Sequence, residues 1–199
     1  MSTDTITLTP DTHRFFHELA TAQAATASYI LSSVARRGGD IAGPLSGPIS
    51  QVCYTRAEEV QFNPIEVLDP ISKEHIWPAE IHLTFQPGGS APPPYPNPNS
   101  VQLLMGSLYE HAFVTYFAKN EGAIRAKHGR KKNWPDALNF GRIVRNAFAH
   151  GGTLNITDGI SANWGGMRYS QIRNGRRVLY NDLSAGDITV LMLEMDAQF

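Results

Sequence analysis

RNAFAH, at residues 145–150, ends a helix that the sequence predicts between about Trp134 and Gly151. Proline at position 135 suits the first turn of that helix, and the Gly151-Gly152 pair is typical of a helix end. At 3.6 residues per turn, polar side chains share one face of the helix and apolar side chains share the other. The polar face comprises Asn139, Arg142, Arg145, Asn146 and His150. This pattern predicts a helix that packs on a core and presents a polar stripe.

The same stretch resembles the Arg-Asn-x-x-x-His signature of the HEPN superfamily, small helical proteins that are mostly metal-independent RNases acting as dimers. The resemblance covers chiefly residues 100–152. It implies an antiparallel helical bundle, a homodimer, no metal or other cofactor, and a catalytic site of Arg145, Asn146 and His150. Judged on the residues alone, an arginine-rich solvated face ending in a histidine beside a glycine cap explains the stretch equally well.

The motif contains the groups that RNA cleavage needs, because RNA supplies its own nucleophile, the 2′-hydroxyl. A base must accept the hydroxyl proton, an acid must protonate the leaving oxygen, and positive charge must stabilise the phosphorane. Histidine exchanges protons near neutral pH, so His150 is the expected acid or base. Arg145 suits phosphate oxygens, and Asn146 can orient the imidazole or a phosphate. One histidine does not easily fill both proton-transfer roles in one step, and the resemblance implies that a homodimer supplies the second.

Charge is distributed unevenly along the chain, although the formal net charge is only −1. Residues 119–177 contain twelve Lys and Arg residues and three acidic residues, a net charge of +9, and the remaining residues carry −10. A basic segment around the motif is typical of a nucleic-acid surface, because phosphate neutralisation dominates affinity. The residues predicted to bind RNA are Arg125, Lys127, Arg130, Lys131, Lys132 and Arg142. The alternative is that the acidic and basic portions pair with each other.

Apolar residues at helical spacing predict three further helices, at residues 10–37, 100–128 and 184–196. Thr9 and Pro10 are expected to start the first of them. Asn174-Gly175 predicts the turn of a β-hairpin whose strands lie at residues 164–171 and 176–180. Trp164 and Tyr169 on this hairpin are expected to pack in the core, with base stacking as the less favoured alternative.

Residues 38–100 are hard to assign, because many Pro and Gly residues interrupt short apolar runs. Only residues 80–85 resemble a strand, and residues 86–99 are expected to form a proline-rich loop. The predicted fold class is therefore mainly α: a HEPN-like antiparallel helical bundle with a small late β-hairpin and an irregular Pro/Gly-rich insertion at residues 38–100. Residues 1–199 are expected to form one HEPN-like domain.

Composition excludes several classes of protein. No apolar run approaches the ~20 residues that a membrane span needs, and the polar, acidic N-terminus is unlike a secretory signal. Cys53 is the single cysteine, which excludes an internal disulfide and a cysteine-rich zinc site and favours a structural role for its thiol. These features predict a cytoplasmic protein.

Two further sets of residues are weaker candidates for function. Glu110, on the helix predicted at residues 100–128, is expected either to hold Arg145 in place or to face solvent. His13 and His17 have the i,i+4 spacing of a metal-binding pair, but no third ligand is evident. The sequence therefore predicts no metal site.

The sequence as a whole predicts a metal-independent endoribonuclease. Its expected partners are RNA, a second copy of the chain, and an antitoxin or other regulatory protein. A toxin or phage-defence role follows only from the habit of the HEPN family. Two alternatives remain: a catalytically silent HEPN module that binds RNA or a protein, and a structural protein whose basic face pairs with its own acidic portion.

Overall fold

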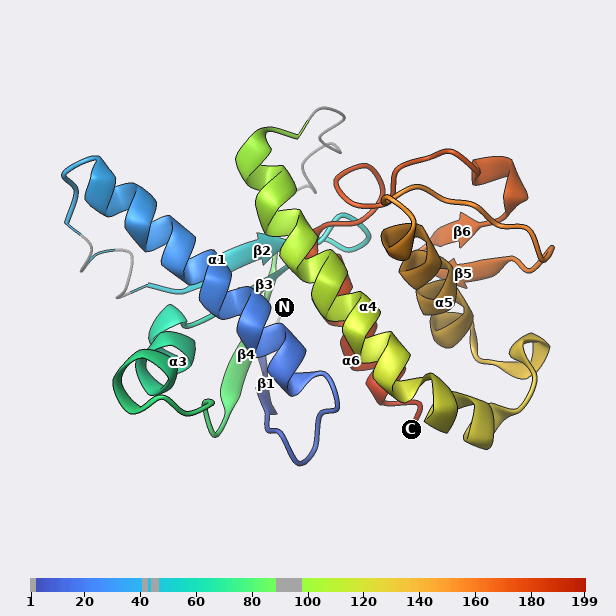
Figure 1. Cartoon of the computed structure of the whole chain (residues 1–199), viewed down its shortest axis with the longest axis horizontal. Helices are drawn as coiled ribbons and strands as arrows, with labels where there is room; N and C mark the ends of the chain where they lie inside the picture. The colour runs from blue at the N-terminus through green and yellow to red at the C-terminus, as the bar shows by residue number, and fades with distance from the viewer. Residues whose placement is uncertain (1–2, 41–42, 44–46, 89–97) are drawn as a thin grey trace.

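A four-stranded antiparallel sheet forms one side of the molecule in this computed structural model, which describes residues 3–40, 43, 47–88 and 98–199 (Figure 1). The strands are β1 (Asp4–Leu8), β2 (Ile49–Val52), β3 (Glu58–Phe62) and β4 (Ile81–Pro87). Their spatial order is β1-β4-β3-β2, so the first strand pairs with the last, with Leu8 opposite Ile81. Alternate residues such as Val60 and Leu83 are fully buried, so one face of the sheet covers the core.

This sheet shows that the predicted fold class is wrong. The chain is mixed α/β rather than a mainly α, HEPN-like helical bundle. The supposedly irregular insertion at residues 38–100 contains β2, β3, β4, the short helix α3 (Pro64–Asp69) and the π-helix η1 (Pro70–Glu74). The strand predicted at residues 80–85 is confirmed as β4, whereas β2 and β3 have only four and five residues and too few apolar positions to reveal their period. The predicted loop at 86–99 falls mostly on residues 89–97, which lie outside the described residues.

Four long helices lie in the part of the chain that the structure describes. They are α1 (Phe16–Arg36), α4 (Ser100–His128), α5 (Asp136–Ala149) and α6 (Ala185–Asp196). Helix α4 contacts the other three: α1 lies along one side of it, α5 along the other side, and α6 behind it in the view of Figure 1. The last three helices confirm the predictions to within about two residues at each end. Helix α1 begins six residues later than predicted, because the Thr9 carbonyl accepts hydrogen bonds from the N–H groups of Thr12 and His13 in a turn.

The late β-hairpin exists, but its pairing differs from the prediction. Strands β5 (Ala162–Trp164) and β6 (Met167–Tyr169) are joined at Gly165-Gly166, both of which have positive φ. Asn174 instead holds the preceding loop, since its side chain accepts from the Ile156 N–H at 2.7 Å and donates to the Ile156 carbonyl at 3.1 Å. Residues 176–178 pair with residues 152–154 just after α5. The segment that follows the RNAFAH motif is therefore fixed to the C-terminal part of the chain.

One hydrophobic core extends from the sheet to the hairpin among the described residues. At its hairpin end, Phe140 of α5 stacks on Tyr169 with ring centroids 4.5 Å apart and lies 5.5 Å from the ring of Trp164. Trp164 and Tyr169 are both buried, which confirms the prediction that they pack in the core. Helix α5 is thereby enclosed between α4, α6 and the hairpin.

Candidate nucleic-acid interface

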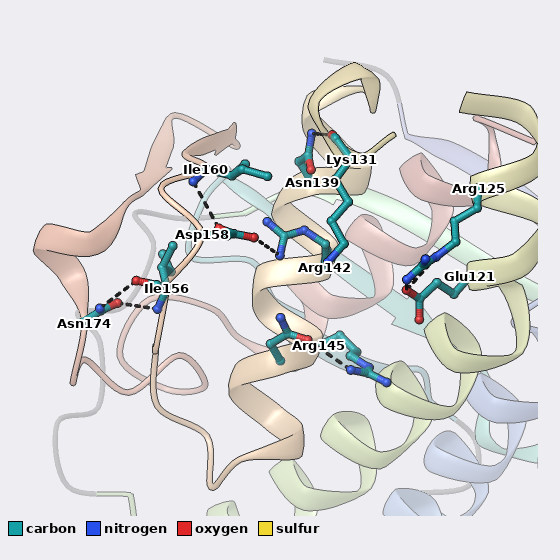
Figure 2. Close-up of polar contacts among 11 residues, drawn as sticks. Glu121, Arg125, Lys131, Asn139, Arg142, Arg145, Ile156, Asp158, Ile160 and Asn174 are labelled. Atoms are coloured by element: carbon teal, nitrogen blue, oxygen red, sulfur yellow. Dashed lines mark hydrogen bonds and ion pairs between the residues drawn. The ribbon is translucent and has the colours of Figure 1, made fainter. Parts of the chain in front are cut away.

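Two of the five residues on the polar face predicted for α5, Asn139 and Arg142, are buried by the rest of the chain. Arg142 is only 5% exposed, and its Nη1 atom lies 2.9 Å from Oδ2 of Asp158 in the loop after α5 (Figure 2). The Asn139 amide donates to the carbonyls of Lys131 and Trp134, both at 3.0 Å. Arg142 therefore lies inside the protein and does not belong to the exposed RNA-binding surface predicted for it.

The last turn of α5 keeps the three residues of the motif nearer the surface. Arg145 and Asn146 are half-buried, and Nη1 of Arg145 donates to Oδ1 of Asn146 at 3.1 Å. Figure 2 shows the Arg145 side chain extending from α5 toward α4. His150 caps the helix, is exposed, and has no side-chain hydrogen bond to any residue that the structure describes. The motif thus provides an accessible imidazole and an arginine held by its neighbour, without a hydrogen bond between them.

A pocket of about 520 Å³ collects most of the basic residues predicted to bind RNA. It lies where α4 ends and the 3-10 helix η2 (Lys131–Asn133) begins, and Gly129, with φ 69°, turns the chain between the two. The pocket is lined by Arg125, Gly129, Arg130, Lys131 and Lys132. All four cationic residues are exposed, so a polyanion can reach them. Lys127 lies elsewhere, because its Nζ donates to the Phe199 carbonyl at 2.6 Å.

The carboxylate of Glu121 links this pocket to Arg145. Arg125 donates to Glu121 from Nε at 3.1 Å and from Nη2 at 2.5 Å (Figure 2). The hydrogen bond from Arg125, together with the positive charges of Arg125, Arg145 and Lys131, lowers the pKa of Glu121. The charge of Arg145 therefore acts on Glu121 from the α5 side, as the charges of the pocket residues Arg125 and Lys131 also do. We call Arg125, Arg130, Lys131, Lys132 and Arg145 the basic surface.

Glu110 lies beside the C-terminal end of α5. Its Oε1 atom would be 3.5 Å from a Cβ atom at Gly152, two residues beyond His150. Burial raises the pKa of Glu110, and the charge of Arg177 opposes that rise. No ion pair joins Glu110 to Arg145 in the described part of the chain. Glu110 therefore does not hold Arg145 in place, and it lies instead beside the His150 end of the helix. Arg177 was missed because its proximity depends on the pairing of residues 176–178 with residues 152–154.

The weaker candidates occupy structural positions. Nδ1 of His13 lies 2.8 Å from the Thr12 hydroxyl, and the His17 ring meets the edge of Trp77 at 5.3 Å. Among the described residues, no three His, Cys, Asp or Glu side chains are close enough together to hold a metal ion. Cys53 is buried, and burial together with the charge of Asp187 raises its pKa to about 12. Its thiol is therefore a poor nucleophile.

Comparisons of the chain with protein-family models, with curated proteins and with solved structures found no match. In the described ranges, no helix has both the length and the apolar character needed to cross a membrane.

Proposed function

We propose that the protein binds RNA on the basic surface and cleaves it, without a metal ion, at the C-terminal end of α5. The observation that carries this proposal is the gathering of Arg125, Arg130, Lys131 and Lys132 around one pocket whose field includes Arg145. Exposed cations suit a phosphate backbone, and among the described residues only Arg125 of these four is ion-paired, with Glu121. A cytoplasmic location and a further regulatory protein partner belong to the same proposal.

The proposed reaction is attack by the 2′-hydroxyl of RNA on the adjacent phosphorus. The O–P bond to the 5′-oxygen of the next nucleotide breaks, leaving a 2′,3′-cyclic phosphate and a free 5′-hydroxyl. Arg145 stabilises the charge on the phosphorane, Asn146 holds the arginine, and His150 transfers a proton.

The second proton-transfer group can come from two places. A homodimer would supply His150 of the partner subunit, as the HEPN resemblance implies. Within one chain, Glu110 lies beside the same end of α5, and burial raises the pKa of its carboxyl, which is the direction that strengthens it as a general base. The variant Glu110→Gln separates these arrangements, because it abolishes cleavage only when Glu110 is the base.

Cleavage of a mixed RNA pool in EDTA tests the proposal. Wild type is expected to leave 2′,3′-cyclic phosphate ends, and His150→Ala is expected to lose turnover by about 100-fold or more while it retains RNA binding. His111→Ala is the matched control, since it removes another exposed histidine, on α4. Equal cleavage by wild type and His150→Ala would refute the assignment of His150.

A non-cleaving RNA-binding module is the second candidate. The absence of a hydrogen bond between His150 and Arg145 among the described residues favours it, because a preorganised active site usually holds its groups together. In that case wild type binds RNA with an affinity that falls with salt, yet yields no cyclic phosphate ends at any protein concentration.

A further inference from the structure

A second pocket, of about 280 Å³, lies between α1, α4, β2 and the start of α6. Tyr54, Tyr109 and Tyr180 contribute three aromatic rings to its lining, and Met105 contributes apolar surface. Its volume is near the lower end of the range for small-molecule sites. Met105 precedes Arg125 of the basic surface by twenty residues on α4, a separation of about 30 Å along the helix axis. The two sites are therefore distinct.

The amide of Gln51 gives this pocket an unsatisfied polar group. Gln51 is 8% exposed, and its Nε2 donates to the hydroxyl of Tyr109. Its Oε1 atom is buried and has no hydrogen-bond partner within the described ranges. A buried carbonyl without a partner is costly, so an N–H donor that reaches this oxygen from the pocket would gain a hydrogen bond.

Tyr180 is held in the pocket wall in a strained conformation. Its φ of 66° lies in the left-handed region, which is unfavourable for a bulky residue. The Tyr180 hydroxyl donates to the Gln102 carbonyl, and a Cβ atom at Gly106 would lie only 2.7 Å from the ring. Glycine at position 106 therefore lets α4 approach the ring. Backbone strain of this kind is concentrated at ligand sites, where it holds a side chain in the orientation that contacts the ligand.

The start of α6 brings hydrogen-bond donors to the same pocket. Ala185 and Gly186 line it, and their N–H groups have no acceptor in the part of the chain that the structure describes. The next residue, Asp187, accepts from the N–H groups of Tyr54, Thr55 and Ser184. Because this buried carboxylate would repel a phosphate, the helix end favours a neutral acceptor atom.

We propose that this pocket binds a nucleobase. The ring lies against the tyrosine side chains, an N–H on its edge donates to Gln51, and a neighbouring ring nitrogen or carbonyl accepts from the start of α6. Nucleobases carry such adjacent donors and acceptors on a flat aromatic ring, which stacks well on tyrosine. The base can come from a free nucleoside or from an unpaired position in RNA. This site goes beyond the proposed function, because it requires neither His150 nor the basic surface.

Calorimetric titration of the full chain with adenosine, guanosine, cytidine and uridine in turn tests the proposal. At least one nucleoside is expected to bind with one-to-one stoichiometry, and Gln51→Leu is expected to weaken that binding about tenfold. Gln23→Leu is the matched control, since Gln23 is also buried with an unpartnered amide but does not line the pocket. Equal weakening by both variants, or no nucleoside binding to wild type and no base preference among oligoribonucleotides, overturns the proposal.

Two further measurements test the location of the site and the source of the base. Met105→Trp fills the pocket from a half-buried position on α4 and is expected to remove nucleoside binding without lowering Tm, which keeps the test valid if Gln51→Leu misfolds. Single-stranded oligoribonucleotides of each base identify the source. A base preference that Gln51→Leu abolishes assigns the pocket to RNA, and nucleoside binding without such a preference assigns it to a free nucleoside. Unchanged binding in a folded Met105→Trp variant contradicts the proposed site.

Discussion

Two arginines on one face of α5 differ in their burial, although the sequence predicts the same exposed position for both. Arg142 is buried beside Asp158, whereas Arg145, one turn later, extends toward α4. Its charge acts there on Glu121, the partner of Arg125. The helical period correctly places both on one face of α5. It does not predict that the loop at residues 155–158 covers Arg142, because the path of that loop is not encoded in a local sequence pattern.

Asp158→Asn tests how Arg142 is held. The variant leaves a buried guanidinium without its carboxylate, and the free energy of unfolding is expected to fall by about 2 kcal/mol, less than for a fully buried pair because Asp158 is about one-third exposed. Urea denaturation measures this change. Glu121→Gln removes the partner of the more exposed Arg125 and is expected to cost less than about 1 kcal/mol. Equal losses in the two variants would contradict the distinction.

Glu110→Gln tests the effect of burial on a carboxyl group. The folded-state pKa of Glu110 is raised above its ordinary value, so wild-type stability falls as pH rises from that ordinary value through the raised one. Glutamine does not ionise, and the variant is therefore expected to have the higher Tm at neutral pH and the same Tm in acid. Glu121, whose pKa is lowered, predicts the opposite sign: Glu121→Gln is the less stable protein at neutral pH, and the difference disappears in acid. A Glu110→Gln difference that is constant with pH would argue against the raised pKa.

At the scale of elements, the sequence predicts well those whose signals are local. Helices α4 and α6 have capping boxes, at Asn99 with Gln102 and at Ser184 with Asp187, and long apolar stripes. The strands are harder to predict from the sequence. Strand β1 pairs with β4 more than seventy residues away, and its own five residues show little alternation of apolar and polar side chains. In the candidate site, the pocket lined by Arg125 and residues 129–132, which we call the basic pocket, was predictable because its residues are nearly contiguous in sequence. The surroundings of Glu110 were not, because they depend on the pairing of residues 176–178 with residues 152–154.

Gly186→Ala tests the contact between α6 and β2. A Cβ atom at this position would lie 2.8 Å from the backbone oxygen of Gln51 and 3.0 Å from that of Val52, and neither atom can easily move. The variant is expected to lose about 1–3 kcal/mol of stability. Gly122→Ala is the matched control, because no atom lies within 4 Å of the added methyl group, and it is expected to gain about 0.5–1 kcal/mol. Thermal denaturation should shift in opposite directions, and a shift of the same sign in both would refute the close packing.

Across the whole molecule, the charge asymmetry of the sequence serves two purposes. Lys119 pairs with Glu18, and Arg176 pairs with Asp182 at 2.5 Å, so part of the basic segment does neutralise the acidic portion. Of the cations that line the pocket, Arg125 is paired with Glu121, whereas Arg130, Lys131 and Lys132 form no ion pair with any described residue. Both interpretations of the charge pattern therefore apply, each to its own residues.

Neutralising the pocket is expected to weaken RNA binding in a salt-dependent way. The triple variant Arg130→Ala, Lys131→Ala, Lys132→Ala removes about three phosphate contacts, so the slope of log affinity against log salt should fall by about 2. The control triple Arg36→Ala, Arg37→Ala, Lys73→Ala makes the same charge change at exposed positions, at the end of α1, directly after it, and on η1. Equal slopes for the two triples would place the RNA elsewhere.

Trp134 makes the basic pocket observable without any label. Its indole is 4% exposed and donates to the carbonyl of Gly129, a residue that lines the pocket, while its ring lies 6.4 Å from that of Phe117. An indole so enclosed emits at short wavelength, and the emission responds to small changes in the local field. Polyanion binding beside Gly129 should therefore change the intrinsic fluorescence, and Trp134→Phe should silence that response while the other two tryptophans continue to emit.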